Sequence, residues 1–392
     1  MTASSKITDL VVIGGGPAGS MLAMRLAASG QRVVLIEKER DAHHKVCGEF
    51  LSREAIHYLE QQGISPRELG AKKIDRVRIS SENKATAAAL PFPALSLSRR
   101  VLDEALLARA GETCEVMRGY GVESVETVGA GKSGGGERSA VKLQGGDTLR
   151  AGTVFLATGK HDLRGWTRPR GKQNDLVGFK MHWRLTNAQI RTLRDHMDLF
   201  VFDGGYGGLS LIENDVANLC LVVRRATLRR HGEWPELLAA IVAENRTLRR
   251  LLDGAEPLWP RPLAISPIPY GYLAAGDRGL WRVGDQAAVI PSFTGDGISI
   301  ALHSAALAAE MFLAGRSAAE FHRALRTQLR RSMTLATWLS RAAVTAAGRA
   351  ALLTGVALFP GSIPAVAAGT RIPQRALVGR LAGLYAAPPR RA

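Results

Sequence analysis

One stretch near the N-terminus most constrains how this chain folds. The apolar run at residues 10–13 predicts a buried strand, and Gly14, Gly16 and Gly19 follow it in the spacing G-x-G-x-x-G. The first glycine allows a tight turn, the second lets a pyrophosphate approach the backbone, and the third lets the next helix pack closely. That helix, predicted over 21–28, directs its N-terminal N–H groups at the phosphates. The stretch therefore predicts a dinucleotide-binding βαβ unit.

An acidic residue ends the second predicted strand. The strand covers residues 32–36 and leads into Glu37, at about the expected spacing of twenty residues from the first glycine. A carboxylate at this position accepts hydrogen bonds from the ribose hydroxyls of an adenosine, and it repels a 2′-phosphate. We therefore expect a dinucleotide other than NADP in this site.

The cysteine content and the net charge limit the cellular compartments and binding partners that we expect for this chain. Cys47, Cys114 and Cys220 stand too far apart for a metal motif or a disulfide framework, which predicts no metal site and a reducing, cytoplasmic location. The net charge of +17 comes largely from arginine. The arginines are scattered and are not interleaved with aromatic residues, so we expect no nucleic-acid partner. No apolar run has the length of a membrane span.

The predicted elements divide the chain into alternating pieces of two domains and a tail. Residues 73–97 predict short strands, and the region after 160 predicts an antiparallel sheet with helices. The expected boundaries are 1–75, 98–165 and 276–330 for a cofactor domain, 76–97 and 166–275 for a substrate domain, and 331–392 for a helical tail.

Four separated motifs together resemble a known flavoprotein fold. They are the glycine turn with Glu37, the helix start Arg99-x-x-Leu102-Asp103, the strand end Ala157-Thr158-Gly159, and the run Gly284-Asp285 … Gly295-Asp296-Gly297-Ile298. In combination they resemble the glutathione-reductase-like flavoproteins, and within them the p-hydroxybenzoate-hydroxylase-fold branch that includes geranylgeranyl reductases and flavin-dependent halogenases. The resemblance covers residues 8–330. It implies an α/β protein, α+β overall, in which an antiparallel-sheet substrate domain is inserted into an FAD-binding Rossmann domain that precedes a helical tail.

The resemblance also implies an FAD site. Asp285 is expected to accept a hydrogen bond from a ribityl hydroxyl, and the helix start at Gly297 to face the N1–C2=O edge of the flavin. Arg99 matches an arginine that reaches the phosphates or ribose, with Arg100 or a solvated side chain as alternatives. Val122 matches a residue whose backbone reads the adenine. The full expected set is Gly14, Gly16, Pro17, Ala18, Gly19, Glu37, Lys38, Cys47, Gly48, Arg99, Val122, Thr158, Gly159, Gly284, Asp285, Pro291, Gly295, Gly297 and Ile298.

The loop Cys47-Gly48-Glu49 resembles one that geranylgeranyl reductases carry beside the flavin. Cys47 is either a redox thiol, a site of covalent flavin attachment, or a small packing residue, and packing is the favoured interpretation. Glu49 is expected to orient the loop or to touch the ribityl chain. The preceding residues 43–45, two histidines and a lysine, are expected on the surface.

Polar side chains alternate along one predicted strand of the substrate domain. Lys180, His182 and Arg184 share a face, with Trp183 on the other. Either one of these three polar residues faces substrate or flavin, or the whole face is exposed to solvent. The solvent-exposed face is the favoured interpretation. Tyr206 and Phe293 are expected to be pocket walls. The candidates for catalysis are Cys47, His182 and Phe293, and no motif assigns an acid or a base.

Two signatures of relatives are missing. The Trp-x-Trp-x-Ile-Pro motif of halogenases does not occur, and Lys160 follows Gly159 where aromatic hydroxylases carry Asp-Gly. We predict an FAD-dependent oxidoreductase, a monooxygenase or reductase with non-covalent FAD. It would act on an apolar or aromatic specialised metabolite, with NADPH or NADH as external electron donor. The alternatives are a C=C reductase or dehydrogenase like geranylgeranyl reductase, a halogenase-like enzyme fed by a partner flavin reductase, and a non-catalytic electron-transfer protein.

The segment 342–368 is apolar but is interrupted by Pro360, Pro364 and several glycines. It is too broken for a spanning helix. The favoured interpretation is a helix that caps the core. The alternative is a surface that rests on a membrane or guides a lipophilic substrate, which would make the protein peripheral to a membrane.

Overall fold

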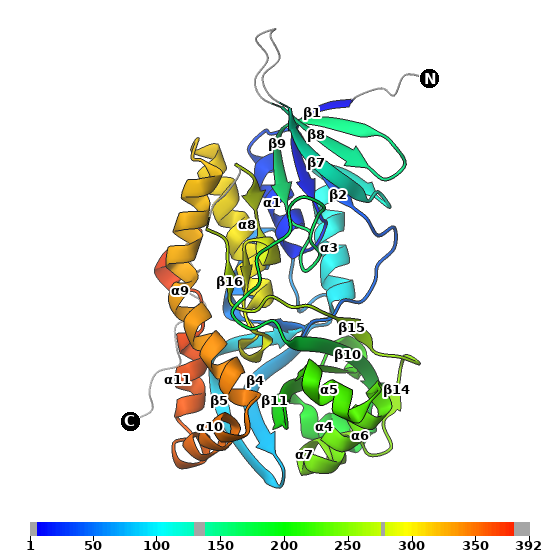
Figure 1. Cartoon of the computed structure of the whole chain (residues 1–392), viewed down its shortest axis with the longest axis vertical. Coiled ribbons are helices and arrows are strands. Elements are labelled where there is room, and N and C mark those ends of the chain that lie inside the picture. The colour runs from blue at the N-terminus through cyan, green and yellow to red at the C-terminus, as the bar shows by residue number, and fades with distance from the viewer. Residues whose placement is uncertain (1–5, 129–137, 276–278, 380–392) are drawn as a thin grey trace.

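The computed structural model describes residues 6–128, 138–275 and 279–379. Two sheets lie one above the other, and a helical C-terminal region runs along one side of both (Figure 1). Mixed α/β architecture with two sheets was the expectation from the sequence, and the structure confirms it.

The first sheet carries the predicted dinucleotide unit. Its order is β6-β2-β1-β9-β8-β7, with β17 beside β9, and β1, β2, β6, β9 and β17 run parallel. Strand β1 is apolar over its second half and is buried there, as parallel strands covered on both faces must be. The strand bounds are β1 Lys6–Ile13, β2 Val33–Glu37, β6 Glu115–Arg118, β7 Val122–Val128, β8 Arg138–Leu143, β9 Thr148–Leu156 and β17 Trp281–Arg282.

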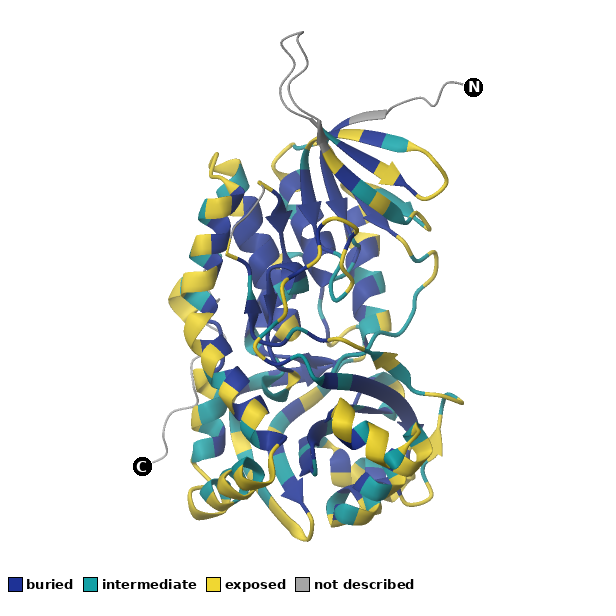
Figure 2. Cartoon of the chain, in the orientation of Figure 1, coloured by how far each residue is buried: buried dark blue, intermediate teal, exposed yellow. Residues whose placement is uncertain are grey.

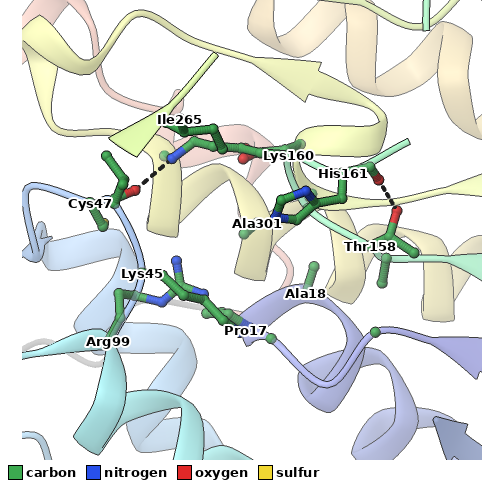
Figure 3. Close-up of a pocket in the computed structure, with 18 of the residues that line it drawn as sticks. Pro17, Ala18, Lys45, Cys47, Arg99, Thr158, Lys160, His161, Ile265 and Ala301 are labelled. Atoms are coloured by element: carbon green, nitrogen blue, oxygen red, sulfur yellow. Dashed lines mark hydrogen bonds between the residues drawn. The ribbon is translucent and has the colours of Figure 1, made fainter. Parts of the chain in front are cut away.

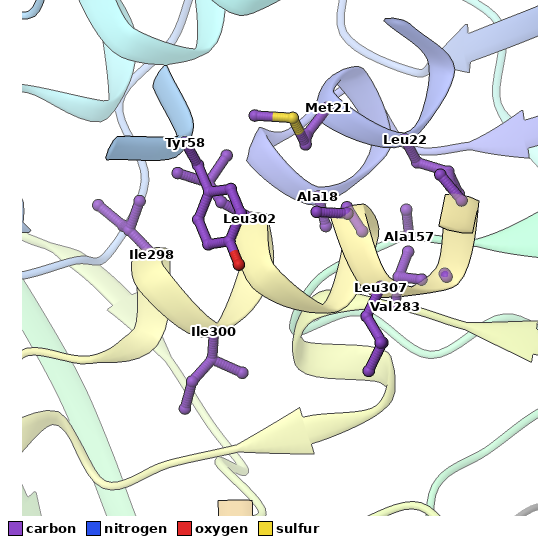
Figure 4. Close-up of a cluster of buried hydrophobic side chains, with 14 of the residues drawn as sticks. Ala18, Met21, Leu22, Tyr58, Ala157, Val283, Ile298, Ile300, Leu302 and Leu307 are labelled. Atoms are coloured by element: carbon purple, nitrogen blue, oxygen red, sulfur yellow. The ribbon is translucent and has the colours of Figure 1, made fainter. Parts of the chain in front are cut away.

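Helices α1 and α8 pack against each other beside this sheet. In Figure 4, Met21 and Leu22 of α1 face the α8 side chains that include Leu302, with Tyr58 of α2 at one end. Leu22 and Leu302 are fully buried, and burial of each such side chain contributes about 2 kcal/mol. The contact sets the two helix N-termini at one cleft. The helix bounds are α1 Pro17–Ala28, α2 Arg53–Gln61, α3 Arg99–Gly111 and α8 Gly297–Leu313.

The second sheet has the order β14-β10-β13-β12-β11-β4-β5-β3, with β15 beside β10. Residues 73–97, expected as short strands, form two long ones, because an alternating pattern sets a face but not where a strand stops. The pair β4–β11 is parallel, so the sheet is not wholly antiparallel. The bounds are β3 Phe50–Leu51, β4 Lys72–Ser81, β5 Lys84–Ser96, β10 Leu176–Arg184, β11 Asp195–Phe202, β12 Gly205–Leu211, β13 Ala217–Arg224, β14 Glu256–Pro257 and β15 Leu263–Ile265.

Short helices cover one end of the second sheet, at the lower right of Figure 1. Their apolar residues, among them Leu237 and Leu248, form a cluster with β10, β12 and β13. Two of these helices, α4 and α5, were not predicted. The bounds are α4 Asn187–Leu193, α5 Arg225–His231, α6 Trp234–Glu244 and α7 Arg246–Leu252, and a small pair β16 Tyr272–Leu273 with β18 Ala288–Val289 links the two halves.

The C-terminal region begins with α9, which starts in a capping box between Ser317 and Glu320. Helix α9 (Ala318–Ala343) crosses the expected boundary at 330, and β4 likewise starts before the boundary expected at 75. Helices α10 (Ala346–Leu358) and α11 (Ser362–Gly369) follow, and α11 packs on β5. Within the described ranges, no single helix is both long and apolar enough to cross a membrane.

Candidate active site

A cleft of about 530 Å³ opens where the carboxyl ends of β1, β2 and β9 meet the N-termini of α1 and α8 (Figure 3). The expected cofactor residues gather here: all of them line the cleft except Gly19 and Pro291. Gly19 instead serves packing, because a Cβ at this position would lie 1.8 Å from the carbonyl oxygen of Gly14. Pro291 is buried and precedes a 3₁₀ turn at Ser292–Thr294.

The phosphate end of the cleft is built from the glycine turn. Gly14 has φ +108°, and a Cβ there would meet the carbonyl oxygen of Ala157 at 2.5 Å, so the turn requires glycine. Among the described residues, no side chain caps α1, and its first turn contains no acidic residue. The N–H groups at this helix start are therefore available to a phosphate.

Glu37 lines the cleft at the end of β2, where the sequence predicts it. Its Oε2 accepts the Gly15 N–H at 2.8 Å and its Oε1 accepts the Glu39 N–H at 3.0 Å. A carboxylate has about four lone-pair positions, so these two bonds fix its orientation and leave acceptors for ribose hydroxyls.

Arg99 is held at the cleft by a carboxylate. Its guanidinium donates two hydrogen bonds to Asp103, at 2.7 and 2.8 Å, and its side chain is only 15% exposed. Lys45 donates to the same carboxylate at 2.9 Å. Lys45, expected on the surface, is partly buried with a 29% exposed side chain, because Asp103 on α3 draws it inward. The alternative of a solvated Arg99 is wrong.

The loop before β3 carries a buried carboxylate. Glu49 has φ +59° and no exposed surface. Its carboxylate accepts the Arg99 backbone N–H at 2.7 Å, forms an ion pair with Lys180, and accepts a hydrogen bond from Nε2 of His182 at 3.3 Å. We call Glu49, Lys180 and His182 the carboxylate clamp. It ties the loop between the two sheets to β10.

The clamp corrects the expectation for β10. Lys180 and His182 are buried rather than solvated, and only Arg184 matches the expected solvated face, with a 70% exposed side chain paired to Glu256. His182 lies behind Glu49, and it is not among the described residues that line either cavity. His44, expected on the surface, packs its ring 4.8 Å from that of His182. The sequence did not reveal that a loop residue covers this strand.

The electrostatics of the clamp follow from its burial. Burial raises the pKa of the Glu49 carboxyl, but the charge of Lys180 and the hydrogen bond from His182 outweigh it, so the pKa lies below the ordinary value. Glu49 is thus ionised near neutral pH and serves as an anchor. Burial, with the nearby charge of Lys180, lowers the pKa of His44 to about 4, so its imidazole is neutral.

A second cavity, of about 550 Å³, adjoins the cleft. Both are lined by Gly48, Phe50, Ser292 and Gly295, so the cavity opens on the inner end of the cleft. Tyr206 and Phe293 line it, with ring centroids 5.1 Å apart, where pocket walls were expected. Most other lining residues are apolar and were not predicted: Val77, Ile79, Leu90, Phe92, Met197, Leu199 and Val201 from the sheet, and Leu352, Leu353, Val356, Ile363 and Val366 from the tail.

Comparisons with known proteins agree with this geometry. The profile of an FAD binding domain family matches residues 7–129. The menaquinone reductase of Mycolicibacterium smegmatis is 26% identical over 78% of this chain and 76% of its own length. The chain is an FAD-dependent oxidoreductase. Digeranylgeranylglycerophospholipid reductase 2 of Methanopyrus kandleri is 28% identical to this flavoprotein over 77% of the chain and 76% of the relative.

Solved structures show the fold of the flavoprotein. The flavin-dependent brominase Bmp2 superposes with a TM-score of 0.74 at 18% identity, covering 94% of this chain and 95% of that structure. The Pseudomonas aeruginosa protein PqsL, as a quadruple mutant, gives 0.69 at 17% identity, covering 86% and 97%. The p-hydroxybenzoate-hydroxylase-like fold expected from the motifs is therefore confirmed.

The cleft of the flavoprotein fits FAD. A Cβ at Gly48 or Gly297 would meet no described heavy atom within 4 Å, so both glycines leave open space. Lys160 donates to the Val46 carbonyl at 2.8 Å and so holds the Cys47 loop over the cleft, as Figure 3 shows. Residues 17–18 at the helix start would hold the diphosphate, Glu37 the adenosine ribose, and the start of α8 the flavin edge.

Arg371 and Asp296 also lie at the site, although no sequence motif assigns a role to either. Arg371, which follows α11, donates to the carbonyl of Thr294 and to Asp296 Oδ2 at 2.8 Å. Its guanidinium lies 5.0 Å from the Phe92 ring centroid and 6.0 Å from that of Phe50. Burial raises the pKa of Asp296 to about 7, although Arg371 opposes the shift. A residue of the tail thus reaches the boundary between cleft and cavity.

Proposed function

We propose that this FAD-dependent oxidoreductase reduces a carbon–carbon double bond in a lipophilic substrate with an isoprenoid chain. The observation that carries the proposal is the apolar cavity that opens on the cleft at Gly48, Phe50, Ser292 and Gly295. The relatives named menaquinone reductase and digeranylgeranylglycerophospholipid reductase support this substrate class. Halogenation and hydroxylation rest on likeness of fold, which hosts several chemistries.

The cavity walls supply binding mainly through apolar contact, because the lining residue Arg371 is already paired with Asp296. Each methylene group that leaves water for this cavity contributes about 0.8 kcal/mol. Val77 and Ile79 of β4 line one wall, and Leu352 and Val356 of α10 line another. An extended apolar chain therefore gains binding energy along its length, and its reacting double bond comes to lie near the shared opening.

The opening lets substrate and cofactor meet. Gly48 and Gly295 place no side chain between cleft and cavity, and Phe50 and Phe293 are apolar residues beside the opening that exclude water. Bound FAD supplies the hydride chemistry that protein side chains lack. Cys47 lines the cleft rather than the cavity, and its side chain packs against the core beside α1 and α8.

Reduction of a double bond adds a hydride and a proton, and the cavity wall holds proton donors. Burial raises the pKa of the Tyr206 hydroxyl and that of the Cys220 thiol each to about 12, so both groups are protonated near neutral pH. The Tyr206 hydroxyl lies 3.0 Å from the hydroxyl of Ser340, which fixes it in place. Tyr206 and Cys220 are thus the two groups that we propose as proton sources. The electron donor is proposed to be NADPH or NADH, directly or through a partner flavin reductase.

An anaerobic single turnover tests the proposal. The FAD-loaded protein is reduced with dithionite, mixed with menaquinone or a geranylgeranyl lipid in detergent, and followed by the return of the yellow flavin band. We expect flavin reoxidation and a product whose isoprenoid chain, rather than its quinone ring, has gained two hydrogen atoms. Failure to reoxidise without oxygen, or a product that gains oxygen or a halide when these are supplied, would overturn it.

A matched pair of variants locates the substrate. Leu90 points from β5 into the cavity, whereas its neighbour Ala89 is exposed on the other face of the strand. Leu90→Trp should keep the flavin spectrum but slow reoxidation by the lipid at least about tenfold, which corresponds to about 1.4 kcal/mol. Ala89→Trp should change neither. Equal rates in both variants would place the substrate elsewhere.

A further inference from the structure

The C-terminal helices present an apolar, basic face to the outside. Among the described residues, Phe359, Leu358 and Trp338 are the most exposed large apolar side chains, at 70%, 67% and 61%. Helix α10, every residue of which the structure describes, contains no buried residue. Figure 2 shows the exposed surface continuing from α9 onto α10. The inner side of α10, with Leu352 and Val356, packs against buried apolar clusters, as expected of a helix that caps the core, while its other side is exposed.

Two of these exposed residues are also at the apolar cavity. Trp338 and Phe359 line it together with inward residues of α10, so the wall of the cavity reaches the outer surface between α9 and the end of α10. The exposed apolar side chains thus surround an entrance rather than a closed wall. An apolar rim of this kind is costly in water and marks a binding surface.

The charge of this region is predominantly positive. After Glu320 the sequence contains no aspartate or glutamate, while α9 contains a series of arginines. At 100° per residue, Arg323, Arg331 and Arg341 lie within about 60° of Trp338 around the axis of α9, and all three are exposed. An exposed stripe of arginine and tryptophan complements an anionic, apolar interface.

We propose that the face formed by α9 and α10, which we call the docking face, binds an anionic lipid bilayer. Trp338, Leu358 and Phe359 enter the headgroup region, and the arginines of α9 pair with lipid phosphates. A second copy of the chain is a poorer occupant, because an isologous contact would set two arginine-rich faces against each other. The binding itself does not require the proposed function.

The docking face has a consequence that does rest on the proposed function. If the substrate carries an isoprenoid chain, it resides in the bilayer, and the entrance at Trp338 and Phe359 would pass it from lipid to cavity without crossing water. The wall of α10 between entrance and cavity then selects apolar chains. The position of the entrance explains why an enzyme of this kind would keep large apolar side chains exposed.

Vesicle binding tests the docking face on the full, FAD-loaded chain. Vesicles of phosphatidylglycerol and phosphatidylcholine are compared with pure phosphatidylcholine by co-sedimentation at two salt concentrations. We expect tighter binding to the anionic vesicles, weakening with salt, and a blue shift of tryptophan emission that Trp338→Phe abolishes. Arg323→Gln with Arg331→Gln should weaken binding roughly twenty-five-fold, because each arginine near the surface contributes about fivefold.

The controls separate this proposal from the proposed function. Leu313→Ser removes an exposed apolar residue at the end of α8, outside the docking face, and should leave vesicle binding unchanged. The arginine variant should keep the wild-type rate of flavin reoxidation by lipid in detergent. Equal binding of the arginine variant and wild type, or a dimer that Leu358→Ser with Phe359→Ser dissociates, would overturn the docking proposal. If the wild-type protein binds vesicles but its reduced flavin is not reoxidised by the lipid, the proposed function is contradicted and the docking proposal stands.

Discussion

Replacing Lys180 with methionine removes the ammonium group that faces Glu49 and keeps most of the side-chain volume. Both side chains are fully buried, so bulk solvent does not screen the carboxylate that loses its partner. The carboxylate of Glu49 would retain the Arg99 backbone N–H and His182 as donors. The variant therefore leaves a buried carboxylate with two hydrogen bonds and without its fully buried counter-charge.

The expected cost follows from this geometry. Breaking a buried ion pair by removing one partner costs about 3–5 kcal/mol, and the two remaining donors place Lys180→Met near the lower end. Adding Glu49→Gln removes the stranded charge and should recover most of the loss. Arg184→Met is the matched control, because this residue lies on the same strand in an exposed pair with Glu256, worth about 0–1 kcal/mol.

Urea unfolding of the FAD-loaded protein, followed by far-ultraviolet circular dichroism and flavin fluorescence, measures these differences. The pKa of Glu49 is lowered in the folded state, so its contribution is present above the ordinary glutamate pKa and is lost as the pH falls through the folded value. In Lys180→Met this pH dependence should shrink or reverse. If Lys180→Met and Arg184→Met unfold at the same urea concentration, the clamp does not stabilise the fold and the reasoning fails.

Three further outcomes are expected. Gly16→Val should abolish FAD retention, seen as the ratio of flavin to protein absorbance, whereas Gly355→Ala in α10 should not change it. Glu37→Ala removes a charged acceptor of the ribose hydroxyls and should raise the Kd for FAD by about tenfold to a hundredfold, measured by flavin fluorescence titration. Asp296 has a raised pKa of about 7, so its contribution to stability is full below its unfolded value and is lost as the pH rises through 7. Asp296→Asn should remove that decline in unfolding measurements between pH 5 and 8.

The parts of the site that sequence reasoning predicted are those that a short stretch of backbone determines. The glycine turn, Glu37 at the end of β2, and the start of α8 at Gly297 each depend on local conformation and on the order of elements in a parallel sheet. These features depend little on which distant side chain packs against them. They gather at one cleft because strands that run parallel present their carboxyl ends together.

The parts that failed depend on contacts between distant residues. Alternation placed Lys180 and His182 on one face of β10, but it could not show that Glu49, 131 residues away from Lys180, covers that face. A buried lysine is rare unless it is paired, so a solvent-exposed face is the prediction that the sequence of β10 favours. Likewise, the apolar composition of α10 predicts a helix that caps the core, but it could not show that this helix also forms the wall of a cavity.

Arg371 belongs to the tail in sequence but contacts the cofactor cleft in space, so the tail cannot be studied by deleting it. It holds Asp296 at the N-terminus of α8 and lies over the rings of Phe50 and Phe92, yet it follows the helices that bear the docking face. Deleting the tail would therefore remove the counter-charge of a buried carboxylate beside the cofactor cleft, as well as any membrane contact. A truncated protein that loses activity would not distinguish the two effects. Point variants at exposed positions such as Arg331 leave Arg371 in place, so only they can assign a loss of membrane binding to the docking face.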